Sequence, residues 1–157
     1  MNITVLKDVM IEAGRLDRYF EGFVPVTLWR AYNIAKGSGP FDFVEQAMVL
    51  SNGRPRPADI TIREMQGRGK WVFVQDRPRG LSTFDQPGLP PGKDWRYLRI
   101  PAGTQLPEGL TIIKDELNER WQATHYTIAP AYDMPLDNFK ALLARLGEIL
   151  AAAEKAQ

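Results

Sequence analysis

The sequence predicts a single α+β domain, in which a mixed or antiparallel β-sheet forms the core and helices flank it. The chain has 157 residues, the size of one ordinary domain, so we assign residues 1–157 to one unit. Patterns typical of strands dominate the second half, and patterns typical of amphipathic helices lie near the two ends. A sheet with helices packed on it buries the apolar side of each of these elements.

In the first third of the chain, residue spacing predicts a helix, a strand and a second short helix. Apolar residues recur at helical spacing over residues 4–20, and Gly22 ends that pattern. Residues 23–32 are rich in β-branched and aromatic types and precede the breaker cluster at residues 36–40, so we expect a strand there. We expect the short helix over residues 41–50.

The basic part of the chain lies in its middle. Residues 54–79 contain seven Lys and Arg against three Asp and Glu, together with three Pro and two Gly. This composition predicts loops around a short strand at residues 70–75. Such loops are typical of a solvated surface, and a phosphate-binding face is the alternative.

Strand patterns follow from residue 95 onward, and a helix completes the chain. We predict strands over residues 95–100, 110–114 and 121–128. Pro135 then begins a helix with one apolar stripe. The stripe consists of Leu136, Phe139, Leu142, Leu143, Leu146, Ile149 and Leu150. We expect it to pack on the sheet, with a partner protein as the alternative.

Composition excludes several classes of function. The chain has no cysteine and one histidine, which excludes disulfides, thiolate metal sites and cysteine nucleophiles, and we predict no metal site. A net charge of +1 argues against nucleic acid as a partner. The N-terminus lacks a signal-peptide pattern and no stretch approaches the ~18 apolar residues of a membrane span. We therefore expect a cytoplasmic protein without a membrane partner.

Three short segments carry side chains suited to chemistry: residues 28–31, 80–84 and 120–128. Arg30 lies in an apolar strand, so it requires a carboxylate or a ligand phosphate if it is buried, or water if the strand is at an edge. Ser82 and Thr83 offer hydroxyls and Phe84 offers a ring for stacking. A pair of hydroxyls is also typical of an ordinary turn.

The third segment contains the one histidine. Period-two alternation places Gln122 and Thr124 on one face of a strand and His125 on the other, unless a bulge intervenes. A lone histidine in a strand is more often a hydrogen-bonded structural residue than a base. The sequence contains no G-x-G-x-x-G, Walker or G-x-S-x-G motif, so common enzyme signatures do not decide the function.

The order of these segments resembles the type VI secretion exported effector two family, cytoplasmic antibacterial toxins with an ADP-ribosyltransferase-like fold. The strings that carry the resemblance are Leu28-Trp-Arg-Ala31, Gly80-Leu-Ser-Thr-Phe-Asp85, Ile100-Pro-Ala-Gly-Thr104 and Gln122-Ala-Thr-His-Tyr-Thr-Ile128. The resemblance covers about residues 26–35 and 80–145. It implies an ADP-ribosyltransferase fold for the α+β domain.

The resemblance also implies NAD as a substrate and assigns residues to it. The NAD-binding residues would be Arg30, Ser82, Thr83 and Phe84, and the catalytic residues Gln122, Thr124 and His125. In the wider superfamily a glutamate stabilises the positive charge that develops on the ribose. The Gln122-Ala-Thr124 register has a threonine at that position, and a hydroxyl cannot supply the missing negative charge.

The function implied is an antibacterial toxin that transfers ADP-ribose to an unidentified intracellular target, reaches its target cell without a signal peptide and is neutralised by a cognate immunity protein. Three alternatives stay open. One is an NAD glycohydrolase, with water as the acceptor. Another is an enzyme acting on a nucleic-acid end guided by residues 54–79. The last is a non-catalytic interaction module that kept the fold, as the absent glutamate would allow.

Overall fold

The computed structural model describes residues 2–74 and 78–156. These residues form a six-stranded sheet in the order β1-β9-β10-β7-β2-β8, with antiparallel neighbours throughout. Its strands are β1 (Tyr19–Phe20), β2 (Leu28–Asn33), β7 (Leu81–Phe84), β8 (Trp95–Ile100), β9 (Leu110–Asn118) and β10 (Ala123–Pro130). The helices are α1 (Leu6–Glu12) and α2 (Leu136–Lys155), with short 3-10 turns η1 (Leu16–Arg18) and η2 (Ile34–Lys36). The predicted α+β class is confirmed.

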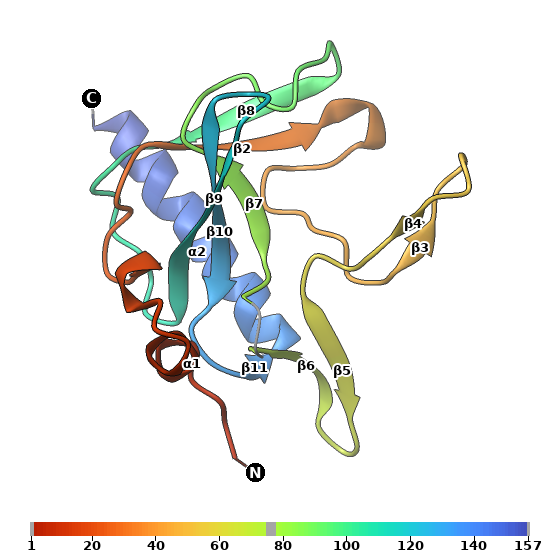
Figure 1. Ribbon diagram of the computed structural model, residues 1–157, viewed down its shortest axis with the longest axis vertical. Helices are drawn as coiled ribbons and strands as arrows, with labels where there is room; N and C mark the ends of the chain where they lie inside the picture. Colours follow the sequence, from red (N-terminus) through yellow and green to blue (C-terminus); the bar gives the residue numbers. More distant parts are fainter. Residues whose placement is uncertain (1, 75–77, 157) are drawn as a thin grey trace.

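Two smaller sheets lie beside the principal one, on the right of Figure 1. One joins β11 (Met134–Pro135), β6 (Gly69–Phe73) and β5 (Thr61–Met65), and the other pairs β3 (Met48–Val49) with β4 (Pro55–Arg56). The basic segment at residues 54–79 therefore contains more strand than its Pro and Gly content predicts. The predicted strand at residues 70–75 is found as β6, although Gln75 lies outside the described residues.

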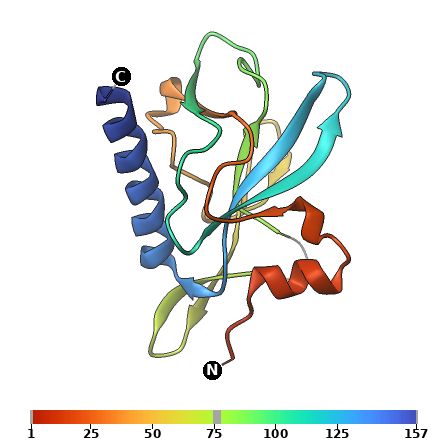
Figure 2. The same cartoon turned by 90° about the vertical axis from the view of Figure 1, so that its left-hand side faces the viewer.

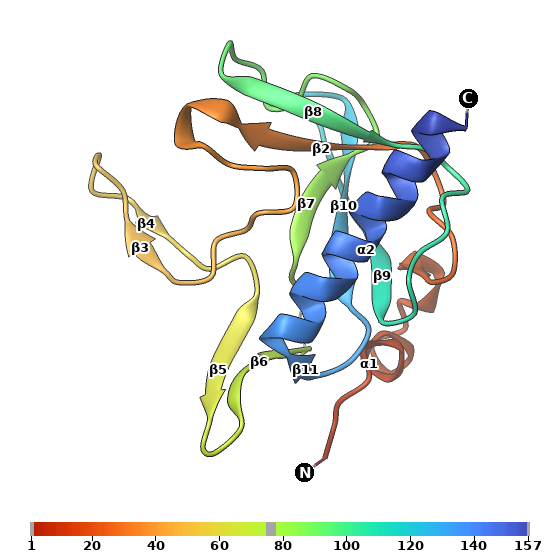
Figure 3. The same cartoon turned by 180° about the vertical axis from the view of Figure 1, so that it is seen from behind.

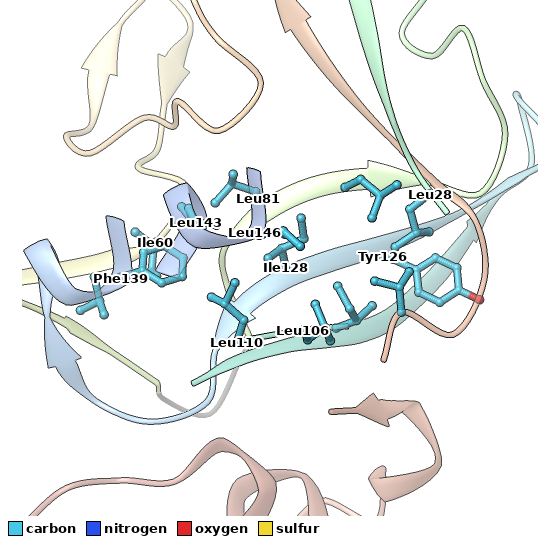
Figure 4. Packing of buried hydrophobic residues seen from close by; sticks show 14 of the residues in the cluster. Leu28, Ile60, Leu81, Leu106, Leu110, Tyr126, Ile128, Phe139, Leu143 and Leu146 are labelled. Atoms are coloured by element: carbon cyan, nitrogen blue, oxygen red, sulfur yellow. The ribbon is translucent and has the colours of Figure 1, made fainter. Parts of the chain in front are cut away.

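Helix α2 covers one face of the principal sheet (Figure 3). Its buried residues Phe139, Leu143 and Leu146 join Leu81 and Ile128 of the central strands in the main core (Figure 4). Burial of such side chains contributes roughly 1.5–3 kcal/mol each. The prediction that the C-terminal apolar stripe packs on the sheet is thus confirmed, and the partner-protein alternative for that stripe is wrong.

Helix α1 packs on the opposite face of the sheet (Figure 2). Leu6 and Met10 of α1 form a second core cluster with Ile113 of β9 and Ala129 of β10. The predicted helix over residues 4–20 is too long, because Gly14 has φ +70 and interrupts the helix soon after Glu12. The rest of that range continues through η1 into the edge strand β1.

Two further predictions from the first third of the chain need correction. The strand expected from residue 23 begins only at Leu28. The helix expected over residues 41–50 is wrong, because side-chain hydrogen bonds organise this segment as a loop before β3. Asp42 Oδ2 accepts from the backbone N–H of Gly39, and Asp59 accepts from that of Val44. These bonds satisfy backbone groups that a helix would otherwise pair internally.

The strands of the second half follow their predictions closely. β8 occupies residues 95–100 as expected, whereas β9 extends beyond residue 114 to Asn118. β10 runs over Ala123–Pro130, where the sequence predicts 121–128. Helix α1 packs against Ile113 and Ala129, and the part of the β9–β10 hairpin nearer its turn projects past this helix (Figure 2). We call the face of the principal sheet on which α1 packs the open face, because α1 leaves the β9–β10 hairpin turn uncovered.

Candidate active site

The pairing of β7 with β10 brings chemistry-bearing side chains together on the open face. His125 lies opposite Phe84, and Thr127 lies opposite Ser82. Residues that are opposite each other in an antiparallel pair project from the same face of the sheet. The two pairs therefore form a patch of four side chains contributed by strands that are about 40 residues apart in the sequence.

Thr83, predicted to bind NAD, lies on the other side of β7. Its side chain is 1% exposed, and its hydroxyl donates a 2.9 Å hydrogen bond to the backbone oxygen of Tyr126. Ser82 is exposed on the open face. The two neighbouring hydroxyls thus have different environments: one satisfies a buried carbonyl in the sheet, and the other is available to a ligand.

A first cavity of about 460 Å³ lies between β2, β7 and the loop at residues 38–44. Its walls include the aromatic rings of Trp29 and Phe84, the hydroxyl-bearing Ser82 and the guanidinium-bearing Arg30. This volume is within the range of ~300–1,000 Å³ typical of small-molecule sites. Aromatic surface together with a few polar groups is also typical of such sites.

Arg30 connects the loop to the sheet at the wall of the first cavity. Its Nε donates to Pro40 O at 2.8 Å, its Nη1 to Ser82 O at 3.0 Å and its Nη2 to Asp42 O at 2.7 Å. Burial lowers the pKa of Arg30, and the carboxylate of Asp59 acts in the opposite direction. A guanidinium has five N–H groups, so two are left to receive an anion.

A second cavity of about 590 Å³ lies between the open face and α1. Asp115 Oδ2 accepts the Thr127 hydroxyl at 2.5 Å and lies 2.7 Å from His125 Nδ1. An ionised carboxylate only accepts hydrogen bonds, so Nδ1 carries the proton in this arrangement. The ring of Phe84 meets that of His125 edge to face, with centroids 5.3 Å apart. Phe84 lines both cavities and so separates them.

Gly80 allows β7 to approach β10 closely at this site. A Cβ at this position would lie 1.9 Å from the backbone oxygen of Ile128, which is far inside van der Waals contact. Only glycine, which has no Cβ, fits at this position without a shift of one strand. The close approach sets the positions of Ser82 and Thr127, which also line a smaller hollow together.

Gln122 and Thr124 line neither of the two cavities. Gln122 precedes β10 with φ +50, and its side-chain amide donates to Glu119 O. The backbone N–H of Thr124 donates to Asp85 Oδ1 at 2.8 Å. The β9–β10 register shifts between Thr124 and Tyr126, so the bulge that the sequence allowed as an alternative is present. The structure places Arg30, Ser82 and Phe84 at the first cavity and His125 at the second; their roles stay predictions.

Sequence reasoning assigned no role to Asp115 or Thr127. The period-two pattern does place Thr127 on the same face as His125, and this signal could have identified it. Asp115 comes from the neighbouring strand β9, so its position beside His125 depends on strand register. Register is not visible in one strand's sequence.

Comparison with known proteins gives two findings. A family model described as Tse2 ADP-ribosyltransferase toxin matches residues 8–155 of this chain. The chain is also similar to Toxin Tse2 of Pseudomonas aeruginosa, with 43% identity over 67 residues. That match covers 38% of this chain and 42% of the length of the curated relative.

Proposed function

Because this chain belongs to the Tse2 ADP-ribosyltransferase toxin family, we propose that it is an antibacterial toxin that transfers ADP-ribose from NAD to an intracellular target. The observation that carries the proposal is the first cavity, where Arg30, Ser82 and Phe84 meet. These three residues come from the two segments, 28–31 and 80–84, that resemble the family's NAD-binding motifs.

The groups around the first cavity match the chemistry of NAD. The pyrophosphate is anionic, and the two unused N–H groups of Arg30 can donate to it, with the Arg56 side chain on the same wall. Ser82 offers a hydroxyl to the ribose or the carboxamide. The cationic nicotinamide ring is attracted to aromatic faces, and Trp29 and Phe84 supply them.

The reaction requires stabilisation of the positive charge that develops on the ribose. In the sequence the position of the usual glutamate is held by Thr124, which supplies no charge. Asp115 is the carboxylate that lies with His125 in the second cavity, across Phe84 from the first. The proposal includes the catalytic roles that the resemblance assigns to Gln122 and Thr124.

The partner and delivery follow from the same proposal. We infer a cognate immunity protein, and the mouth of the two cavities is its candidate surface because the apolar stripe of α2 is buried on the sheet. Delivery into the target cell uses a type VI secretion route. Among the described residues, no helix is long and apolar enough to cross a membrane.

Calorimetric titration with NAD, run together with assays of nicotinamide release and of label transfer from labelled NAD, tests the proposal. We expect saturable binding and weaker binding by Ser82→Ala, because its exposed hydroxyl lines the first cavity. Ser51→Ala is the matched control, since it removes an exposed hydroxyl in the segment between β3 and β4. Nicotinamide release without label transfer would indicate a glycohydrolase. Absence of both, with a target-cell lysate present, would refute the proposal.

A further inference from the structure

We propose that His125 and Asp115 form a general-base pair that removes a proton from the acceptor of ADP-ribose, and that the second cavity holds that acceptor. This inference rests on the proposed function and extends it. His125 is the base that touches the acceptor, Asp115 and Thr127 are positioning residues, and the acceptor class is a hydroxyl.

The hydrogen bonds fix which ring nitrogen is the base. Asp115 Oδ2 lies 2.7 Å from His125 Nδ1 and accepts the proton there, so Nε2 carries the free lone pair. Among the described residues Nε2 has no hydrogen-bond partner. A base oriented by a carboxylate at its other nitrogen is the arrangement that activates hydroxyl nucleophiles in several enzyme classes.

Hydrogen bonds hold both the side chain and the backbone of Asp115. The Thr127 hydroxyl donates to the same Oδ2 at 2.5 Å, and Arg18 donates to the backbone oxygen of Asp115 at 2.7 Å. The Phe84 ring packs against the edge of His125. The imidazole is therefore fixed by contacts from β7 and β9, and Arg18 of η1 fixes the backbone of Asp115, whereas a surface histidine would rotate freely.

The position of the pair assigns it to the acceptor side. His125 lines the second cavity and not the first, while Phe84 borders both. With NAD in the first cavity, a nucleophile in the second approaches the ribose from across Phe84. A carboxylate or phosphate acceptor is already ionised at neutral pH and needs no base, whereas a hydroxyl keeps its proton and requires one; we assign the acceptor to the hydroxyl class on this ground.

The step balances without a further reagent. His125 Nε2 takes the proton of the acceptor hydroxyl as its oxygen bonds to C1′ of the ribose. The bond from C1′ to nicotinamide breaks, and nicotinamide leaves with the bonding electron pair. Asp115 stabilises the imidazolium that forms, and the proton then passes to solvent.

Kinetics test the base directly. His125→Gln should lower kcat for ADP-ribose transfer by about 10²–10⁴, with KM for NAD changed less than about threefold, because the side chain lies outside the first cavity. Asp115→Asn should give the same split between kcat and KM. Glu148→Gln is the matched control, since that acid lies on α2, lines neither cavity, has a side chain that is 68% exposed and pairs with Arg145; kcat should be unchanged. A wild-type kcat in His125→Gln would overturn only the general-base inference. No transfer by the wild-type protein would also refute the proposed function.

Nitrogen NMR tests the positioning roles without any activity. The sequence has one histidine, so ¹⁵N-histidine labelling of the untagged protein reports His125 alone. In the neutral ring we expect the Nδ1–H tautomer in the wild type and in Glu148→Gln. Asp115→Ala should shift the ring toward Nε2–H, and Thr127→Val should give a mixture. An Nε2–H tautomer in the wild type would overturn the pair.

Discussion

Replacing Arg30 by alanine should destabilise the fold as well as weaken NAD binding. The guanidinium makes three hydrogen bonds that connect the loop at residues 40–42 to β2 and β7. The bond to Pro40 is partly buried, and the bonds to Ser82 and Asp42 are exposed, where water replaces a lost donor. If the two exposed hydrogen bonds contribute at the low end of the usual net stabilisation per hydrogen bond, the free energy of unfolding falls by about 2–3 kcal/mol.

Urea unfolding followed by far-UV circular dichroism and tryptophan fluorescence measures this loss. For a chain of this size we expect the midpoint to fall by about 1 M, and Tm by about 5–10 °C. Arg30→Lys keeps the positive charge but offers one point donor in place of a planar fork. It should therefore recover part of the NAD affinity while staying nearly as unstable as Arg30→Ala.

A midpoint for Arg30→Ala within about 0.2 M of the wild type would refute the structural role of Arg30. The outcome also decides how toxicity data are interpreted. If the stability loss is found, reduced toxicity of Arg30→Ala reports folding and ligand binding together. Ser82→Ala then becomes the cleaner test of the proposed NAD site, because the Ser82 side chain is exposed.

Three further predictions concern the sheet and its core. Gly80→Ala should lower Tm by several degrees, because its Cβ would lie 1.9 Å from Ile128 O; a Tm within 1 °C of wild type would contradict this. Burial and Glu21 raise the pKa of Tyr19 above its unfolded value of 10.0, so stability is full below pH 10 and is lost at higher pH. Tyr19→Phe should reduce the loss of urea stability between pH 9 and 11, and an unchanged loss would contradict that assignment. Leu146→Ala should cost about 2–5 kcal/mol in urea unfolding, and less than 1 kcal/mol would place it outside the core.

Local sequence patterns predicted the elements whose residues repeat regularly. The apolar stripe after Pro135 identified α2, and β-branched and aromatic runs identified β8, β9 and β10. The helix predicted over residues 41–50 failed because Asp42 and Asp59 hydrogen-bond to loop backbone, and Asp59 lies 15 residues from its partner Val44. A window of local sequence contains no record of such a partner.

At the candidate site, too, local sequence predicted some features, and others depended on tertiary contacts. The segments around Arg30, Ser82 and His125 were evident from residue types and their order along the chain. The sequence pattern did not show that Thr83 lies on the buried side of β7 or that Arg30 is held by backbone carbonyls. Both facts depend on which neighbours the sheet brings into contact.

By itself the sequence determined the α+β class, the absence of cysteine chemistry and the segments that carry the candidate site residues. The first two follow from composition and from periodicities of 2 and 3.6, and the segments follow from their residue types and the family resemblance; all of these are local properties. The tertiary structure decided that Ser82 lies opposite Thr127, that Phe84 lies opposite His125 and that Asp115 joins them from β9. The reason is physical: strand register and the close packing that Gly80 permits are set by contacts between distant residues, and these form only when the sheet is assembled.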